Sequence, residues 1–166
     1  MRSRYVRGIT IRPLRNGDVG TVAAVFSRLG GASRARRFCG AKPRLSDADL
    51  ALLARVDATH HVLVAYVGDD PSPAGIARLV RDGATGEIAF EVVDHLQGRG
   101  IGSLLAYELA ADARAAGIAR LVATVCGDNE PAVSLLRRLT RSLEVRWQGG
   151  EREFVLSLVE PSATTP

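Results

Sequence analysis

Gln97-Gly98-Arg99-Gly100-Ile101-Gly102 has three glycines in six residues and joins a segment typical of a strand to a segment typical of a helix. Glycine adopts backbone angles that other residues avoid and has no side chain to block a ligand. The N–H groups of the loop and of the first helical turn can therefore converge on one point, at the positive end of the helix dipole. We expect this loop to bind a phosphate or pyrophosphate group.

The segments on both sides of the loop have clear periods. Along residues 87–93, Ile88, Phe90 and Val92 alternate with other side chains, which predicts a strand. After the loop, apolar residues recur at every fourth position up to Gly117, a residue type at which helices commonly end. The sequence therefore predicts a long helix whose inner face consists of Ile101, Leu105, Leu109 and Ala113.

The spacing of the glycines excludes two common nucleotide-binding motifs. The dinucleotide fingerprint G-x-G-x-x-G needs a glycine at position 103 or 105, where Ser103 and Leu105 stand. The P-loop needs Gly-Lys-Ser/Thr, whereas the single lysine of the chain is Lys42. We therefore expect neither a nicotinamide cofactor nor a P-loop nucleotide at this loop.

The loop resembles the Q/R-x-x-G-x-G/A motif of the GNAT superfamily of N-acetyltransferases, which binds the pyrophosphate of acetyl coenzyme A (acetyl-CoA). Asn129-Glu130-Pro131-Ala132 is similar to that family's N-x-x-A motif, and residues 9–14 are similar to its opening strand. The resemblance covers residues 9–159 and implies the α/β (α+β) GNAT fold. That fold is a mixed, mostly antiparallel sheet of six to seven strands flanked by about four helices.

Residue periods and turn residues place these elements along the chain. Helices are expected at residues 18–29, 47–55, 101–117 and 131–139. Strands are expected at residues 9–14, 62–67, 74–80, 87–93, 120–126, 142–147 and 153–159. Residues 33–46 are expected to be an arginine-rich connection between the first two helices.

The resemblance also implies how acetyl-CoA would be bound. Its pyrophosphate would lie on the loop, at Gln97, Gly98, Arg99, Gly100, Ile101, Gly102 and Ser103. Its pantetheine arm would pair with the backbone of Phe90 and Val92, where two strands splay apart, and the Val92 amide would stabilise the oxyanion. Asn129 of the second motif completes this set. No metal is expected, because no residues have metal-ligand spacing.

Acetyl transfer to an amine needs a group that accepts the proton of the amine. A lysine side chain has a pKa of about 10.4 and is therefore protonated at neutral pH. Glu87 and Glu91 share one face of the predicted strand, roughly 13 Å apart, which is too far for one paired site. Glu91 is nearer the phosphate loop, where a carboxylate would repel the ligand, so we expect Glu87 to be the general base. The stretch Glu87-Ile88-Ala89-Phe90 also resembles the strand that carries the catalytic glutamate in lysine-acetylating GNAT enzymes; a surface charge at the strand end is the alternative.

One position departs from the family pattern. Many members have a tyrosine seven residues after the motif asparagine, as general acid for the departing thiolate, whereas this chain has Leu136. Direct proton donation from that position is therefore excluded. A thiol with a pKa of about 8.5, by analogy with cysteine, still leaves moderately well without this help.

The acceptor is less well defined than the donor. Residues 33–46 are similar to the corresponding region of bacterial Pat-type protein-lysine acetyltransferases. That similarity implies a protein lysine as acceptor, with acidic residues beside it contacted by Arg36, Arg37 and Arg44. A solvated arginine-rich loop is the alternative for this segment. A small-molecule amine acetyltransferase and an acyl-CoA-sensing module without turnover also stay open as functions.

Composition restricts the remaining classes. The 166 residues, 46% of them apolar, are expected to form one domain over residues 1–160 with a disordered tail at 161–166. A cytoplasmic protein is expected, because the longest central apolar run, residues 62–67, is too short for a membrane and the N-terminus has no secretory signal. We also expect a monomer or a weak homodimer. The net charge is +4 but only 5% of residues are aromatic, so nucleic acid is not an expected partner. Cys39 and Cys126 are expected to be free thiols.

Overall fold

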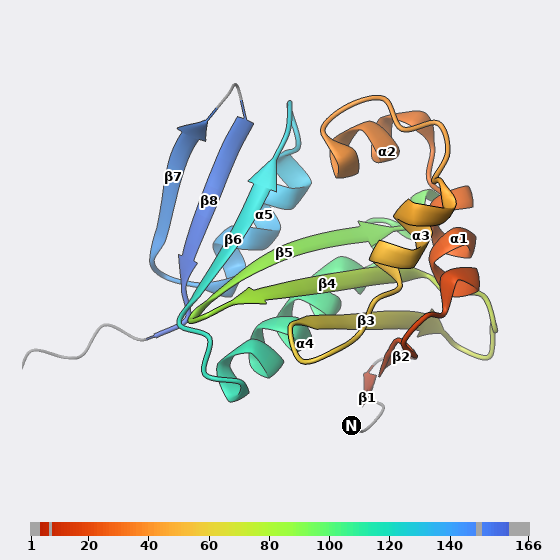
Figure 1. The fold of residues 1–166 in the computed structure, drawn as a ribbon, viewed down its shortest axis with the longest axis horizontal. Coiled ribbons are helices and arrows are strands. Elements are labelled where there is room, and N and C mark those ends of the chain that lie inside the picture. Colours follow the sequence, from red (N-terminus) through yellow and green to blue (C-terminus); the bar gives the residue numbers. More distant parts are fainter. Residues whose placement is uncertain (1–3, 7, 149–150, 160–166) are drawn as a thin grey trace, which may run out of the picture.

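The computed structural model describes residues 4–6, 8–148 and 151–159 (Figure 1). This part of the chain forms one eight-stranded sheet in the order β1-β2-β3-β4-β5-β6-β8-β7. The strands are β1 (Arg4–Val6), β2 (Ile9–Pro13), β3 (His60–Val67), β4 (Gly75–Asp82), β5 (Thr85–Val92), β6 (Arg120–Val125), β7 (Leu143–Gln148) and β8 (Glu151–Ser157). The helices are α1 (Val19–Ser27), α2 (Gly31–Phe38), α3 (Asp47–Leu53), the 3-10 helix η1 (Asp94–Leu96), α4 (Ile101–Ala115) and α5 (Glu130–Leu139). The tail expected at residues 161–166 lies outside the described residues.

The connections of the sheet agree with the expected fold. Paired strands are antiparallel with the exception of β5 and β6, which are parallel. Strands β3, β4 and β5 form the predicted meander, in which Asp82 at the end of β4 pairs with Thr85 at the start of β5. The mixed, mostly antiparallel sheet flanked by helices is therefore confirmed.

Helices cover both faces of the sheet (Figure 1). Helix α4 packs on β3, β4 and β5, and its predicted inner face is confirmed because Ile101, Leu105, Leu109 and Ala113 are all buried. This helix ends just before Gly117, which has the left-handed φ of 76°. The opposite face carries α2 and α3. Two arginine contacts join these helices to the sheet, Arg37 of α2 to Glu91 of β5 and Arg78 of β4 to the Leu53 carbonyl of α3.

The structure has elements that the sequence periods did not predict. Strand β1 adds an eighth strand, and helix α2 occupies the segment that was expected to be a connection. Helix α2 is short and rich in arginine and has no fully buried residue, so it carries too few apolar side chains to be identified by an apolar period. Contacts made by other parts of the chain hold it instead, including the Gly30 N–H bonded to the Asp94 carboxylate and the Arg34 guanidinium over the Phe26 ring.

The two cysteines form a disulfide, so the expectation of free thiols is wrong. Cys39 follows the last residue of α2 and Cys126 follows the last residue of β6. Their Cα atoms are 5.3 Å apart, although 87 positions separate the two residues in the sequence. Only the placement of α2 beside the end of β6 brings them together.

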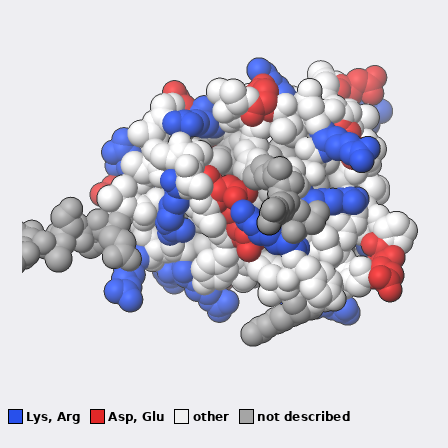
Figure 2. Space-filling model, turned by 90° about the horizontal axis from the view of Figure 1, so that it is seen from below, with Lys and Arg blue, Asp and Glu red and all other residues white. Residues whose placement is uncertain are grey.

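The surface of the described residues mixes both signs of charge. On the face drawn in Figure 2, basic and acidic side chains are interspersed and do not gather into one large basic patch. Among the residues that the structure describes, no helix combines the length and the apolar character needed to cross a membrane.

Candidate active site

A cleft opens where β5 and β6 separate. The two parallel strands pair only from Thr85 to Glu87, opposite residues 120–122. Beyond this point β6 is paired only on its other edge, where β8 runs along residues 120–125, and the ribbons of β5 and β6 diverge (Figure 1). The opening belongs to a cleft of about 710 Å³ that reaches from β5 and β6 to the glycine loop, α2 and α5. A long, thin ligand can lie between the two strands.

One edge of the cleft is a stretch of β5 backbone that has no neighbouring strand on the side of the opening. The N–H of Val93 donates to the carbonyl of Ala74 at 3.0 Å, on the β4 side. Successive residues of a strand turn their backbone groups to opposite sides, so those of Phe90 and Val92 face the opening. The side-chain amide of Gln97 donates to the Val92 carbonyl at 3.0 Å from that same side. The strand therefore offers hydrogen-bonding groups to a bound chain.

The glycine loop forms one end of the cleft. Gly98 and Gly100 have φ of 75° and 83°, the left-handed region that favours glycine. Within α4, the N–H of Leu104 bonds to the Gly100 carbonyl at 3.0 Å, so the N–H groups of residues 101–103 have no partner inside the helix. This arrangement places several free donors at the positive end of a 15-residue helix, which suits a pyrophosphate.

The side chains of the loop divide into two groups. The loop residues that line the cleft are Gln97, Gly98, Gly100, Gly102 and Ser103. Ile101 is buried in the core, and the exposed Arg99 lies outside the cleft lining. Ile101 can therefore meet a ligand in the cleft with its backbone only.

Helix α5 forms the opposite wall. Asn129 lines the cleft and caps this helix, since its side-chain oxygen accepts the Ala132 N–H at 3.3 Å. The sequence had pointed to Pro131 and Ala132 as motif residues and to position 136 as the place of the family's tyrosine, and all three line this wall. Sequence reasoning missed Ser134, Leu135 and Arg138, which line it too. Their helical spacing after a capping asparagine is the signal that could have identified them. Leu136, at the family's tyrosine position, is 2% exposed and offers no proton donor.

Glu87 lies where the cleft begins. It is the last residue of β5 that pairs with β6 before these two strands diverge. The Glu87 side chain is exposed on the sheet face that carries α2. Its neighbour in register is Val122, so Thr124 lies on the same face of β6, two residues farther along the opening. Both Glu87 and Thr124 line the cleft. A substrate that enters from the α2 side can thus reach the Glu87 carboxylate.

Glu91 has a different environment from Glu87. Its side chain is 4% exposed and bonds to Arg78 Nη1 at 2.6 Å and to Arg37 Nε at 3.0 Å. Burial alone would raise the pKa of Glu91, but the charges and hydrogen bonds of the two arginines hold that pKa below its usual value. The carboxylate therefore stays ionised with its charge balanced by the two guanidinium groups, and Glu91 ties α2 to the sheet. Sequence reasoning missed Arg78, which comes from β4.

The three arginines expected at the acceptor lie in different places. Arg36 is exposed and lines the cleft. Arg37 also lines the cleft, but its Nε is engaged with Glu91. Arg44 is exposed on the connection between α2 and α3, outside the cleft lining. Of the three, Arg36 has the placement best suited to contact an acceptor.

Known proteins share both the sequence pattern and this fold. Residues 33–140 match the Acetyltransferase (GNAT) family. The acetyltransferase Pat of Mycolicibacterium smegmatis is 35% identical over 133 aligned residues, and the match covers 78% of this chain and 40% of Pat. The chain thus spans less than half the length of this relative.

Two solved structures have similar folds. The GNAT domain of S. lividans PAT is 26% identical with a TM-score of 0.81, and the match covers 90% of each chain. The structure of yncA from Salmonella typhimurium with its cofactor acetyl-CoA is 22% identical, covers 96% of this chain and 99% of that one, and has a TM-score of 0.67. The second likeness shows the fold alone. From the family match over residues 33–140 and the shared fold, the chain belongs to the GNAT family of acetyltransferases.

Proposed function

We propose that this chain transfers the acetyl group of acetyl-CoA to the side-chain amine of a protein lysine. The observation that carries the proposal is the cleft itself, which joins a phosphate-binding loop, a free strand edge and an exposed carboxylate. The Pat and PAT relatives support a protein as the acceptor.

The chain's residues fit acetyl-CoA in an extended pose. The free N–H groups at residues 101–103 and the loop backbone would hold the pyrophosphate. The backbone groups of Phe90 would bond to the amide groups of the pantetheine arm, as a partner strand does, and the Val92 N–H would stay available for the thioester oxygen. The thioester would then lie in the opening between β5 and β6, where the acceptor can approach from the α2 side.

Glu87 would act as the general base. The acceptor nitrogen forms a bond to the thioester carbon, and the amine proton passes to the Glu87 carboxylate. The N–H of Val92 would donate to the carbonyl oxygen while that oxygen carries negative charge. Glu87 and Val92 are five residues apart, roughly 16 Å along the strand, so the proton would pass from the amine to Glu87 through a chain of several water molecules.

No side chain is needed to protonate the departing thiolate. Leu136 cannot do so, and a thiol with an ordinary pKa of about 8.5 leaves as the thiolate and takes a proton from water. This absence of a dedicated acid suits a reaction whose difficult step is deprotonation of the amine.

The proposal is tested by mapping the products. Purified protein is incubated with acetyl-CoA and a panel of lysine-containing proteins, with small primary amines in parallel, while thiol release and acetylated sites are measured by mass spectrometry. We expect acetylated lysines to appear together with thiol release. Acetylation of small amines alone would overturn the protein acceptor, and binding of acetyl-CoA without thiol release for any amine would indicate a sensor.

Gly100→Ala is expected to weaken acetyl-CoA binding. Alanine at a φ of 83° is strained by about 1–2 kcal/mol, and the loop relieves this strain by turning its N–H groups away from the ligand. Binding must restore the strained conformation, so the Kd should rise roughly 5–30-fold in titration calorimetry. Gly68→Ala is the control, because Gly68 has a φ of 56° in the turn after β3 and lies outside the cleft lining. Equal changes in Kd for both variants would contradict the assignment of the loop.

A further inference from the structure

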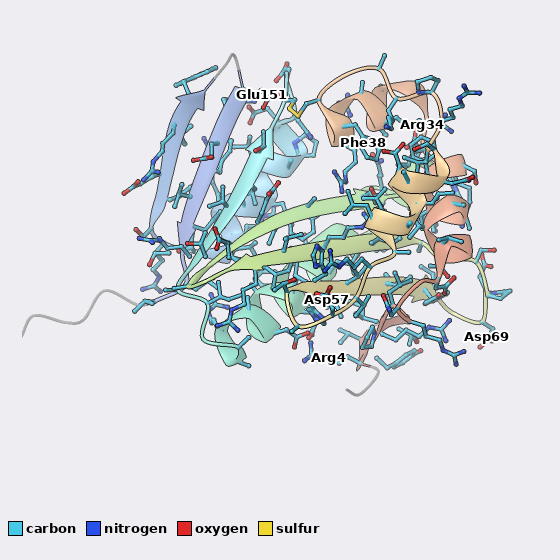
Figure 3. All side chains as sticks on the ribbon, in the orientation of Figure 1. Arg4, Arg34, Phe38, Asp57, Asp69 and Glu151 are labelled. Atoms are coloured by element: carbon cyan, nitrogen blue, oxygen red, sulfur yellow. A yellow bond between two sulfur atoms is a disulfide. The ribbon has the colours of Figure 1, made fainter. Side chains whose placement is uncertain are left out.

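The disulfide between Cys39 and Cys126 joins helix α2 to β6 at the cleft (Figure 3). Cys39 caps the C-terminal end of α2, is exposed and lines the cleft. Cys126 continues β6 and is partly buried. The sulfur bond therefore fixes the end of α2 against the strand that forms one side of the opening.

On the other side of the opening, α2 is held by polar contacts with β5 and the segment after it. Arg37 pairs with Glu91, the Gly30 N–H bonds to Asp94, and the Ser33 hydroxyl accepts from Gln97. Among the described residues, no hydrogen bond or ion pair joins α2 to β6, β8 or α5. Helix α2 thus crosses the opening with the Glu91 ion pair at one side and the disulfide at the other.

We infer that Cys39 and Cys126 are a redox modification site that controls how acceptors enter the cleft. The oxidised pair forms when a low-molecular-weight disulfide exchanges with the two thiols. One cysteine sulfur attacks that disulfide and releases a first thiol, and the second cysteine sulfur then displaces the other thiol. Two protein S–H bonds become one S–S bond, and the small disulfide takes up the two electrons and two protons as two thiols.

The exposure of the pair supports exchange with small thiols. Cys39 is exposed, so a thiolate in solution can approach its sulfur. Exposed disulfides are typically the labile or regulatory ones, whereas structural disulfides are buried and resist reduction. The Glu151 carboxylate lies within 4.8 Å of both sulfurs, which also places the bond at the polar end of β8 and not in the core.

Reduction of the disulfide removes the bond that holds the C-terminal end of α2 against β6. Helix α2 has no fully buried residue, so without the disulfide its C-terminal end has no described anchor on β6. Arg36 and Phe38, which line the cleft, move with this end. In the reduced form this end of α2 can therefore move away from β6 and widen the route to Glu87 for a bulky acceptor, whereas the oxidised form keeps the opening that the structure shows. This effect on the acceptor rests on the proposed function, but the redox chemistry does not.

The test places the full chain in one buffer of reduced glutathione and one of oxidised glutathione. Both buffers contain EDTA, so that no metal ion can bind between the thiols and Glu151. Mass spectrometry after alkylation counts the thiols, and hydrogen exchange follows the amides of α2. Cys39→Ser and Cys126→Ser are the matched variants, because serine keeps the size of the side chain and cannot form the bond.

We expect the wild type to lose two thiols on oxidation, and the α2 amides to exchange faster in the reduced protein and in both variants. The KM for a protein acceptor should be about fivefold or more higher for the oxidised wild type, within the usual range of coupling between sites. The KM for acetyl-CoA should not change. The double variant Cys39→Ser/Cys126→Ser, which has no thiol left for glutathione to modify, should show the same acceptor KM in both buffers.

Two results would overturn the inference. Failure of the two thiols to pair in oxidised glutathione would exclude the modification site. Pairing without any change in α2 exchange would exclude control of the cleft. If the reduced protein acetylates no acceptor, the proposed function is wrong, yet thiol counts and hydrogen exchange still decide whether the redox site exists.

Discussion

Replacing Glu87 with glutamine is expected to lower kcat about a hundredfold to ten-thousandfold, the usual contribution of a general base. Glutamine keeps the shape of the side chain but cannot accept the proton of the amine. Because Glu87 is exposed and several residues away from the phosphate loop, the affinity for acetyl-CoA should be unchanged. Thiol release at saturating acceptor measures kcat, and titration calorimetry measures the affinity.

Glu144→Gln is the matched control for this experiment. Glu144 lies on β7, its side chain is 67% exposed, and it does not line the cleft. Its replacement should leave kcat as it is in the wild type. A Glu87→Gln rate equal to that of the control would remove Glu87 from the mechanism and leave it as a surface charge.

Replacing Glu91 with alanine is expected to destabilise the protein by about 3–5 kcal/mol, as when one partner of a buried ion pair is removed. The change leaves the guanidinium of Arg78 buried at 6% exposure without its carboxylate. It also releases Arg37 and hence one anchor of α2. Urea unfolding followed by circular dichroism measures the free energy of unfolding.

Two comparisons make the Glu91 result specific. Glu144→Ala, an exposed site, should stay within about 0.5 kcal/mol of the wild type. Arg37→Ala should cost less than Glu91→Ala, because Glu91 keeps its bond to the more deeply buried Arg78. A Glu91→Ala variant as stable as the wild type would show that the three charges are not buried together.

The same ion pairs give Glu91 a pH signature. Since its pKa is lowered in the folded protein, the stability it contributes is fully present above the ordinary glutamate pKa, about 4.3. That contribution is lost as the pH falls through the lower pKa of the folded state. The free energy of unfolding of Glu91→Gln should therefore depend less on pH in acid than that of the wild type.

Local patterns were sufficient for most of the fold. The alternation along β5 and the four-residue spacing along α4 are set by neighbours within one element, so the sequence alone shows them. The glycines at positions 98 and 100 likewise indicate, from the sequence alone, a loop with unusual backbone angles, and both residues have left-handed φ in the structure. Helix α2 was not predicted, because it is short and rich in arginine and none of its residues is fully buried. Its position depends on contacts with other parts of the chain.

The candidate site divides in the same way. The loop, the β5 edge and Glu87 were predicted because they lie within a short stretch of chain around one motif. Ser134, Leu135 and Arg138 of the α5 wall were missed, since they line the cleft only after α5 packs beside α4 and β8. The role of Glu91 was also missed, because its partner Arg78 stands on the neighbouring strand.

The sequence by itself determined a glycine loop with free backbone donors as its expected feature, the strand and helix around it and a carboxylate at the far end of that strand. Their spacing is fixed by covalent geometry and by the rise of each element. Only the tertiary structure decided which side chains meet across long separations. Arg37 reaches Glu91 over 54 positions and Cys39 reaches Cys126 over 87, and these contacts place helix α2 over the cleft. Such pairs depend on the packing of whole layers, so no local period contains them.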